Sequence, residues 1–358
     1  MRILHIMASK ALGGAETYST DVMLSLHRQG IDQCVVMPKD TPRYDELEKA
    51  GIRMAPQVLS APFLPLQKFL TRRLIAREKP DIVHTWMRRG AALAGFWGQG
   101  SGFKKILSSP RSSLQPPTPI IIGWFGGYYD TDKFTNCAHL VGVTKDIVAH
   151  MVKNGVPAAC AHFIPTFPDV PALPPIDRAT LATPRNAKVL LTLSRLHPKK
   201  GLDTMLASLQ NLPDCILWLA GDGPLRRELE TLAKKLGVID RVRFLGWRTD
   251  RAALLRASDI CVLPSRYEPF GTVILEAWAA GTPLVACASA GPAAHIENDV
   301  NGLLTPIDDV AALTAALRRA LDDENLRRRL VAQGYAAYIK DYTRESVTQQ
   351  WIRFYKSL

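Results

Sequence analysis

The sequence predicts an α/β fold of two domains, each built on a parallel β-sheet. Short apolar runs of strand length alternate with helical patterns along the 358 residues. Such alternation is typical of parallel sheets with helices on both faces. Prolines concentrated in residues 163–184 stop regular structure near the middle of the chain. A chain of this length can form a hydrophobic core in each half.

The sequence predicts six strands in each half of the chain. Each predicted strand is a short apolar run bounded by turn residues or by a helical pattern. The first half contains such runs at 3–6, 34–37, 81–85, 106–109, 139–143 and 162–164, and the second at 189–193, 216–220, 242–245, 260–263, 284–286 and 302–304.

The proline-rich stretch sets the predicted domain boundaries. We expect an N-terminal domain over 1–168, a linker over 169–184, a C-terminal domain over 185–340 and a separate C-terminal segment over 341–358. No internal repeat or low-complexity segment interrupts this plan.

Composition narrows the class of protein. The formal charge of +12, from 45 basic and 33 acidic residues, favours a polyanionic partner. Zinc-finger, RNP and helix-turn-helix signatures are absent from the sequence, so we expect no nucleic acid. No run of about 20 apolar residues predicts a membrane span. The first residues read as a strand and not as a signal peptide, and six cysteines without C-x-x-C spacing fit buried thiols in the cytoplasm.

The most informative stretch is EPFGTVILEAWAAG at 268–281. Residues 272–280 read as a helix closed by Gly281, with Glu268 in the preceding loop and Glu276 within the helix. Amides near Gly271 and Thr272 would point out of the helix N-terminus, where an anion is favoured. Carboxylates accept hydrogen bonds from hydroxyls. The segment therefore suits a ligand with a phosphate and a polyol, as in a nucleotide sugar.

This segment resembles the E-x7-E motif of retaining glycosyltransferases of family 4, which have the GT-B fold. Four further stretches are similar to that family in the same order. They are GGAE at 13–16, SRLHPKKG at 194–201, AGDGP at 220–224 and VRFLG at 242–246. The resemblance implies two Rossmann-like domains facing across a cleft, with the helix 344–358 returning to the N-terminal domain.

The resemblance also implies roles for individual residues. Arg195 and Lys200 would hold the donor diphosphate, Glu276 the ribose hydroxyls, and Glu268 the transferred sugar, which makes Arg195, Lys200 and Glu268 the predicted catalytic residues. The remaining predicted donor-site residues are Gly14, Gly221, Phe244, Leu245, Phe270, Gly271 and Thr272. Phe244 and Leu245 also fit an ordinary strand core, and the glycines also fit plain turns.

The acceptor side is predicted in the first domain, at Gly13, His84, Arg88 and Arg89. Many family members have a histidine two residues beyond the position of His84, where this chain has Trp86. That departure leaves a core position for His84 as an open alternative. A second departure is Thr166, where the family often has asparagine.

We expect no metal and no cofactor. Asp130-Thr131-Asp132 matches the D-x-D pattern of metal-dependent glycosyltransferases, but it falls in the first domain, away from the predicted donor site. Two basic residues can neutralise a diphosphate in place of a cation.

An apolar stripe at helical spacing lies beside basic residues in the first domain. It comprises Leu66, Phe69, Leu70 and Leu74, next to Lys68, Arg72, Arg73 and Arg77. The pattern suits a helix at an anionic membrane surface. It equally suits a helix that covers the sheet.

Together these features predict a retaining, metal-independent hexosyltransferase. The donor would be a nucleotide-diphosphate sugar, and the acceptor a saccharide of a surface glycoconjugate, such as a lipopolysaccharide core or a lipid-linked glycan. We expect a cytoplasmic protein, with peripheral placement at the inner face of the cytoplasmic membrane as a hypothesis. The alternatives are a GT-B-fold epimerase or phosphorylase, and a non-enzymatic sugar-nucleotide sensor.

Overall fold

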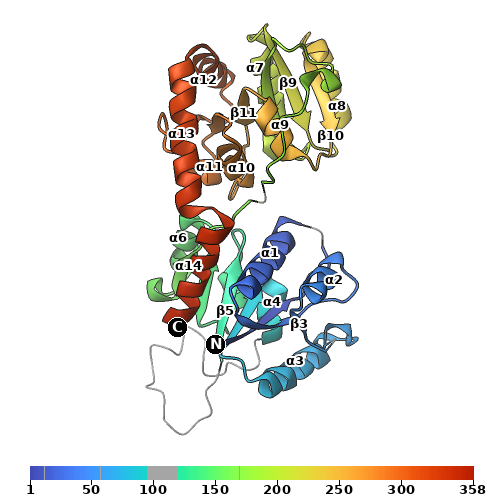
Figure 1. Cartoon of the computed structure of the whole chain (residues 1–358), viewed down its shortest axis with the longest axis vertical. Coiled ribbons are helices and arrows are strands. Elements are labelled where there is room, and N and C mark those ends of the chain that lie inside the picture. Colours follow the sequence, from blue (N-terminus) through green and yellow to red (C-terminus); the bar gives the residue numbers. More distant parts are fainter. Residues whose placement is uncertain (12, 57, 95–118, 169) are drawn as a thin grey trace. The chain divides into compact units, whose positions relative to one another are not determined.

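The computed structural model describes residues 1–11, 13–56, 58–94, 119–168 and 170–358. Within them the chain forms two compact units, each with its own parallel sheet (Figure 1). Unit 1 comprises Met1–Thr166 together with Arg344–Leu358, and unit 2 comprises Phe167–Thr343. The predicted fold class, with two α/β domains, is confirmed.

The sheet of unit 1 is parallel throughout, in the order β3-β2-β1-β4-β5-β6-β7. Its central strands are buried on both faces, as expected for a sheet between two layers of helices. The strands are β1 (Arg2–Met7), β2 (Asp32–Val36), β3 (Arg53–Met54), β4 (Ile82–Trp86), β5 (Ile120–Phe125), β6 (His139–Gly142) and β7 (Ala161–Phe163).

Two of these strands, β3 and β5, were not predicted. β3 has only two residues, too few for a pattern. β5 contains Gly123, which reads as a strand breaker but is required by packing. A Cβ at this glycine would lie 2.8 Å from side-chain atoms of Leu140 and of Phe134. The strand predicted over 106–109 lies outside the described residues.

Helices and short 3₁₀ turns connect the strands of unit 1. The α-helices are α1 (Gly14–Arg28), α2 (Pro42–Lys49), α3 (Leu64–Glu78), α4 (Met87–Ala94), α6 (Lys145–Lys153) and α14 (Arg344–Ser357), and the 3₁₀ turns are η1 (Val58–Ser60), η2 (Thr131–Phe134) and η3 (Ala158–Cys160).

The helix α14 belongs to unit 1 although it follows all of unit 2 in the sequence (Figure 1). The indole of Trp351, fully buried, donates to the Tyr18 hydroxyl at 3.0 Å. The Tyr355 hydroxyl and His84 Nδ1 are 2.7 Å apart. The predicted return of the C-terminal helix to the N-terminal domain is therefore confirmed.

Unit 2 has a six-stranded parallel sheet in the order β10-β9-β8-β11-β12-β13. All six strands were predicted to within a residue or two. They are β8 (Lys188–Leu193), β9 (Cys215–Ala220), β10 (Val242–Gly246), β11 (Ile260–Leu263), β12 (Leu284–Cys287) and β13 (Leu303–Thr305).

Helices cover both faces of this sheet, and strand residues such as Leu190, Leu217 and Val262 form a hydrophobic core with the helices over 202–210, 226–235, 310–322 and 324–341. The helices are α7 (Leu202–Gln210), α8 (Arg226–Lys235), α9 (Arg251–Ala257), α10 (Thr272–Ala280), α11 (Ala290–His295), α12 (Val310–Asp322) and α13 (Glu324–Asp341), and the 3₁₀ turns are η4 (Arg178–Leu181), η5 (Pro198–Lys200) and η6 (Ile239–Arg241).

The end of the proline-rich stretch is fastened to unit 2. The Arg178 guanidinium donates to the carbonyls of Ala187 and Ala257, each at 2.8 Å, and pairs with Asp259 at 3.1 Å. Two hydrogen bonds to backbone carbonyls and one ion pair from a single side chain thus fix this segment next to the starts of β8 and β11.

Two expectations from composition hold for the described residues. None of their helices is long and apolar enough to cross a bilayer. All six cysteines are buried, and none forms a disulfide.

Candidate active site

The strand order of unit 2 marks the place for a ligand. From β8 the chain adds β9 and β10 on one side, and then β11, β12 and β13 on the other. The topological switch point thus lies between β8 and β11. In open α/β sheets ligands bind at such a point, beyond the carboxyl ends of the strands. The loops that follow β8 and β11 carry the predicted SRLHPKKG and EPFG motifs.

A glycine brings these two loops together. Gly201 follows the turn η5 with a φ of 60°, and a Cβ there would lie 2.0 Å from the Pro264 carbonyl oxygen. Only glycine fits so close a backbone approach at a positive φ. As a result Lys200 Nζ lies 2.5 Å from Glu268 Oε2, with both side chains 16% exposed. Two residues predicted for one site from distant motifs therefore form an ion pair.

Arg195 lies in the same loop but remains exposed. It forms no hydrogen bond or ion pair with the residues that the structure describes. The neighbouring Lys199 instead places its ammonium 4.6 Å from the centre of the Tyr267 ring. The switch point thus has one paired cation, Lys200, and one cation available to an anion, Arg195.

The loop before α10 is held by a second glycine. The amide of Gly291 donates to the Glu268 carbonyl at 2.7 Å, and a Cβ at Gly291 would lie 2.4 Å from the Phe270 carbonyl oxygen. Phe270 is buried against the His295 ring, at 4.7 Å between centroids. This packing fixes Glu268 between the sheet and the helix.

The N-terminus of α10 has no side-chain cap. The capping residue is Gly271, with a φ of 86°, and the helix spans Thr272–Ala280 as predicted. Its first amides are therefore not satisfied by a side chain and point beyond the helix start. With Lys200 and Arg195 nearby in the switch-point loops, this end of unit 2 suits a phosphate.

Glu276, inside the same helix, is only 2% exposed. Its Oε1 accepts from Arg251 Nη1 at 2.7 Å, and its buried Oε2 has no partner among the described residues. Burial raises the pKa of the Glu276 carboxyl, and the Arg251 cation opposes that rise. Arg251 was not predicted as a site residue, because no sequence motif links the start of α9 to α10.

Two glycines of the AGDGP stretch, one of them the predicted site residue Gly221, pack the loops after β8 and β9 together. A Cβ at Gly221 would lie 1.8 Å from the Ser194 carbonyl oxygen, and one at Gly223 would lie 2.5 Å from that of Leu196. These glycines hold the loop that carries Arg195. Phe244 on β10 is half-buried, with the Arg226 guanidinium 4.4 Å above its ring, and Leu245 beside it is also half-buried.

Buried hydroxyls without partners gather at the same carboxyl edge. They lie at or just after the ends of β8, β11 and β12, and only Ser194 falls within a predicted motif. The hydroxyls at this edge without a partner among the described residues belong to Thr192, Ser194, Ser265 and Ser289. A polar ligand would supply the missing hydrogen bonds, since orphaned buried polar atoms are rare in proteins.

The corresponding edge of unit 1 has its switch point between β1 and β4. There Glu16 lies over the start of α1, with Oε1 2.5 Å from Ser9 Oγ. A Cβ at Gly13 would lie 2.7 Å from Glu16 Oε2, whereas one at Gly14 would meet nothing within 4 Å. Gly13 is thus needed to fold Glu16 back onto its own helix.

Arg88 and Arg89 are exposed at the start of α4, which follows β4. The Arg88 guanidinium lies 5.7 Å from the centre of the Tyr129 ring, in the segment after β5. Both arginines are therefore near the carboxyl edge of the unit 1 sheet, as predicted for the acceptor side.

The prediction that places His84 on the acceptor side is wrong. His84 is fully buried on the central strand β4, stacked on Trp86 at 4.1 Å between centroids and bonded to Tyr355 of α14. Burial lowers the pKa of His84 well below its usual value and keeps the ring neutral. Alternation along β4 turns this side chain toward α14, and no sequence pattern indicated its contact with Tyr355. Trp86 is buried in the same cluster.

The D-x-D stretch has a local structural role. Asp130 caps the turn η2, with its Oδ1 accepting from the Asp132 amide at 3.1 Å. In the described part of the chain no three histidine, cysteine or carboxylate side chains are grouped so that they could hold a metal ion.

Comparison with known proteins adds two family matches. Residues 175–337 match the model described as "Glycosyl transferases group 1", and residues 12–170 match that of "Glycosyltransferase Family 4". The lipopolysaccharide core biosynthesis glycosyltransferase LpsE of Rhizobium meliloti is 31% identical over 361 residues, which is 100% of this chain and 99% of that protein. LpsD of the same organism is 29% identical, over 98% of this chain and 97% of LpsD.

Solved structures show the same fold at lower identity. Anabaena Alr3699/HepE in complex with UDP matches with a TM-score of 0.80 at 21% identity, over 100% of both chains. The apo form of the lipopolysaccharide outer core galactosyltransferase WaaB matches with a TM-score of 0.75 at 17% identity, again over 100% of both chains.

Proposed function

Because this chain belongs to the family 4 (group 1) glycosyltransferases with the GT-B fold, we propose that it transfers a sugar from a nucleotide-diphosphate sugar to a saccharide of the lipopolysaccharide core. The observation that carries the proposal is the Lys200–Glu268 pair at the switch point of unit 2. There a cation, a carboxylate and an uncapped helix N-terminus lie together. They match the diphosphate and the sugar hydroxyls of such a donor.

Each part of the donor matches residues at the carboxyl edge of the unit 2 sheet. Arg195 and Lys200 bind the diphosphate, with the first amides of α10 beside them. Glu276 accepts from the ribose hydroxyls, and Glu268 from hydroxyls of the transferred sugar. Uridine is the first base to test, because HepE was crystallised with UDP and with UDP-glucose.

The proposed reaction retains the anomeric configuration. The acceptor hydroxyl attacks the anomeric carbon from the face that the diphosphate leaves. The bond from that carbon to the diphosphate oxygen breaks, and the acceptor's proton passes to the departing oxygen. Arg195 and Lys200 stabilise the negative charge that develops there, so the step requires no metal ion.

The acceptor proposal rests on the relatives and on unit 1. LpsE and LpsD are named for lipopolysaccharide core biosynthesis. Arg88 and Arg89 present positive charge at the carboxyl edge of the unit 1 sheet, which suits an acceptor that carries phosphate or carboxylate groups.

A direct transfer assay tests this function. Purified protein is incubated with UDP-, ADP- and GDP-sugars and with truncated lipopolysaccharide cores, and products are resolved by mass spectrometry. The anomeric proton coupling of the product reports retention or inversion. Nucleotide binding without transfer or hydrolysis would favour the sensor alternative, and conversion of the donor sugar without an acceptor would favour the epimerase.

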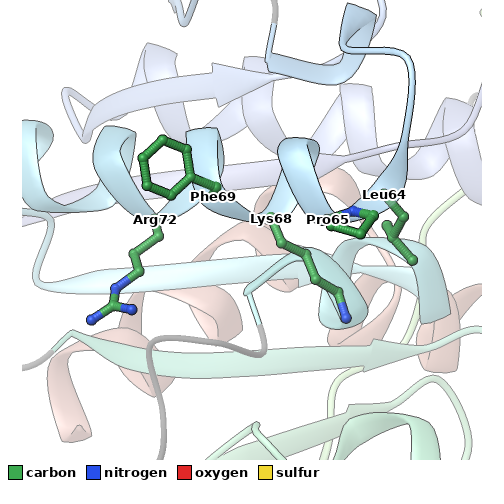
Figure 2. Close-up of a pocket in the computed structure, with 5 residues that line it drawn as sticks. All are labelled: Leu64, Pro65, Lys68, Phe69 and Arg72. Carbon is green, nitrogen blue, oxygen red and sulfur yellow. The ribbon is translucent and has the colours of Figure 1, made fainter.

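We also propose that α3 places the enzyme at an anionic membrane surface. Phe63, Leu64 and Phe69 are 56%, 44% and 54% exposed, although large apolar side chains are usually buried. Lys68 and Arg72 extend to the same side of α3 as Leu64, whereas the Phe69 ring lies on the other side in this view (Figure 2). Together with Pro65 these residues line a pocket of about 450 Å³. Exposed apolar groups among cations are typical of helices that lie on anionic bilayers.

The structure divides the predicted apolar stripe of α3. Leu74 is buried and Leu66 and Leu70 are half-buried, so these residues face the interior of unit 1, whereas Phe69 is exposed. Arg77 is bound to Glu78 at 2.8 Å. The surface proposed for the membrane therefore comprises Phe63, Leu64, Lys68, Phe69, Arg72 and Arg73.

Co-sedimentation with vesicles tests the membrane proposal. The variant with Lys68, Arg72 and Arg73 replaced by glutamine should lose binding to anionic vesicles at low salt, where each cation contributes about 1 kcal/mol. The matched control replaces the three exposed cations of α8, Arg227, Lys234 and Lys235, and should bind as the wild type does. Equal loss in both variants would indicate only a general effect of net charge.

A further inference from the structure

Arg251 lies outside the predicted motifs, yet it contacts Glu276. It is the first residue of α9, which follows β10 in the chain. Its Nη1 donates to Glu276 Oε1 at 2.7 Å across two different helices. The Arg251 side chain is 47% exposed, whereas the carboxylate that it contacts is almost fully buried.

A carboxylate in this position requires a cation. Transfer of an unpaired ionised carboxylate into a protein interior is strongly unfavourable, so such a group takes up a proton instead. From the described elements around α10, Arg251 of α9 and Cys261 of β11 are the charged or titratable groups that interact with Glu276. Burial raises the pKa of Cys261, which stays neutral. Arg251 is thus the group that favours the ionised carboxylate.

The second carboxylate oxygen points to a ligand. Oε2 of Glu276 is buried and has no partner among the described residues. An orphaned buried acceptor is costly, because it has lost its water without gaining a donor. A hydroxyl group is the donor that would satisfy it, and the ribose supplies two adjacent hydroxyls.

We propose that Arg251 is a positioning residue for the donor nucleotide: it holds Oε1 of an ionised Glu276 so that Oε2 accepts a ribose hydroxyl. This inference rests on the ribose role proposed for Glu276 above. The hydroxyl reaches Oε2 only after the side chains over it shift.

Calorimetry on four variants tests the proposal. The probe is whichever of UDP, ADP and GDP binds the wild type most tightly, compared with its 2′,3′-dideoxy form. The dissociation constant of the dideoxy form divided by that of the parent nucleotide measures how much the ribose hydroxyls strengthen binding. The variants are Arg251→Ala, Arg251→Lys and Glu276→Gln, with Arg256→Ala as the matched control on the same helix. Among the described residues Arg256 donates to the carbonyls of Pro171 and Leu173 and does not contact Glu276.

Arg251→Ala should lower this ratio about tenfold near pH 6, the effect of losing one charged hydrogen bond. Because burial raises the pKa of the Glu276 carboxyl and the cation that opposed this rise is gone, the loss should shrink as the pH is raised in this variant. Arg251→Lys should keep most of the wild-type ratio, since the cation remains. Arg256→Ala should match the wild type throughout, and thermal unfolding of each variant monitors folding.

The outcomes separate the two proposals. If Glu276→Gln keeps the full ratio, the ribose assignment of Glu276 fails, and the role of Arg251 fails with it. If Glu276→Gln loses the ratio while Arg251→Ala keeps it at every pH, only the role of Arg251 is overturned. Tighter binding by Arg251→Ala would likewise overturn it and would make this arginine a competitor of the ribose.

Discussion

Replacement of Lys200 by alanine should weaken binding of the nucleoside diphosphate far more than binding of the nucleoside. The Lys200 ammonium has three N–H donors, and one of them is directed to Glu268 Oε2 at 2.5 Å. The other donors are available to a phosphate oxygen. A charged hydrogen bond contributes roughly 1.5–3 kcal/mol, so its loss should raise the dissociation constant about 10- to 100-fold.

Calorimetry of the diphosphate and of the nucleoside, in wild type and variant, measures this difference. Lys199→Ala is the matched control, because it removes the same charge from the same loop, where the ammonium lies over Tyr267. The control should bind both ligands as the wild type does. Wild-type diphosphate affinity in Lys200→Ala would refute the assignment. Equal weakening in the two variants would show that only the general positive field matters.

Three further predictions concern the other carboxylate, the metal and acid stability. Glu268→Gln should lower turnover about 10- to 100-fold, because a contact to the transferred sugar is lost. Calorimetry should show equal or tighter diphosphate binding, since Lys200 is no longer shared between Glu268 and the phosphate. Weaker diphosphate binding would contradict these roles. Turnover should survive excess chelator, because basic side chains neutralise the diphosphate, and its rescue by added manganese would contradict this. Burial lowers the pKa of His5 to about 3 and that of His295 to about 4, from an ordinary value of 6.5. At a pH below 6.5 both histidines therefore bind a proton in the unfolded chain but stay neutral in the folded chain. The free energy of unfolding from urea titration should therefore fall between about pH 7 and 5, by up to about 2 kcal/mol for His5; equal stability at both pH values would refute this reasoning.

The fold followed from the sequence because its strands are short apolar runs between turn residues. The same reasoning missed β5, where Gly123 reads as a breaker. That glycine is required by neighbours from later in the chain, Phe134 and Leu140, which no local pattern reveals. Local signals thus located the elements, whereas long-range packing explains the exception.

The candidate site was predictable where motifs carry it and not elsewhere. Lys200 and Glu268 come from separate motifs, and the structure brings them into contact. Arg251 and His84 show why prediction stopped there. The partner of Arg251 is Glu276 on another helix, and the partner of His84 is Tyr355 on α14. Side-chain partners from distant segments are set by tertiary packing, which leaves no local pattern.

The helix α14 also sets the order in which the chain can fold during translation. Unit 1 needs Trp351 and Tyr355 to complete its core, but all of Phe167–Thr343 is made between its two parts. At 5–20 residues per second, synthesis of that insertion takes about 9–35 s. For this interval the nascent first unit exposes the apolar surface that α14 later covers, while the second unit can already fold. The N-terminal half of this enzyme is therefore expected to finish folding last and to depend on chaperones that shield that surface near the ribosome.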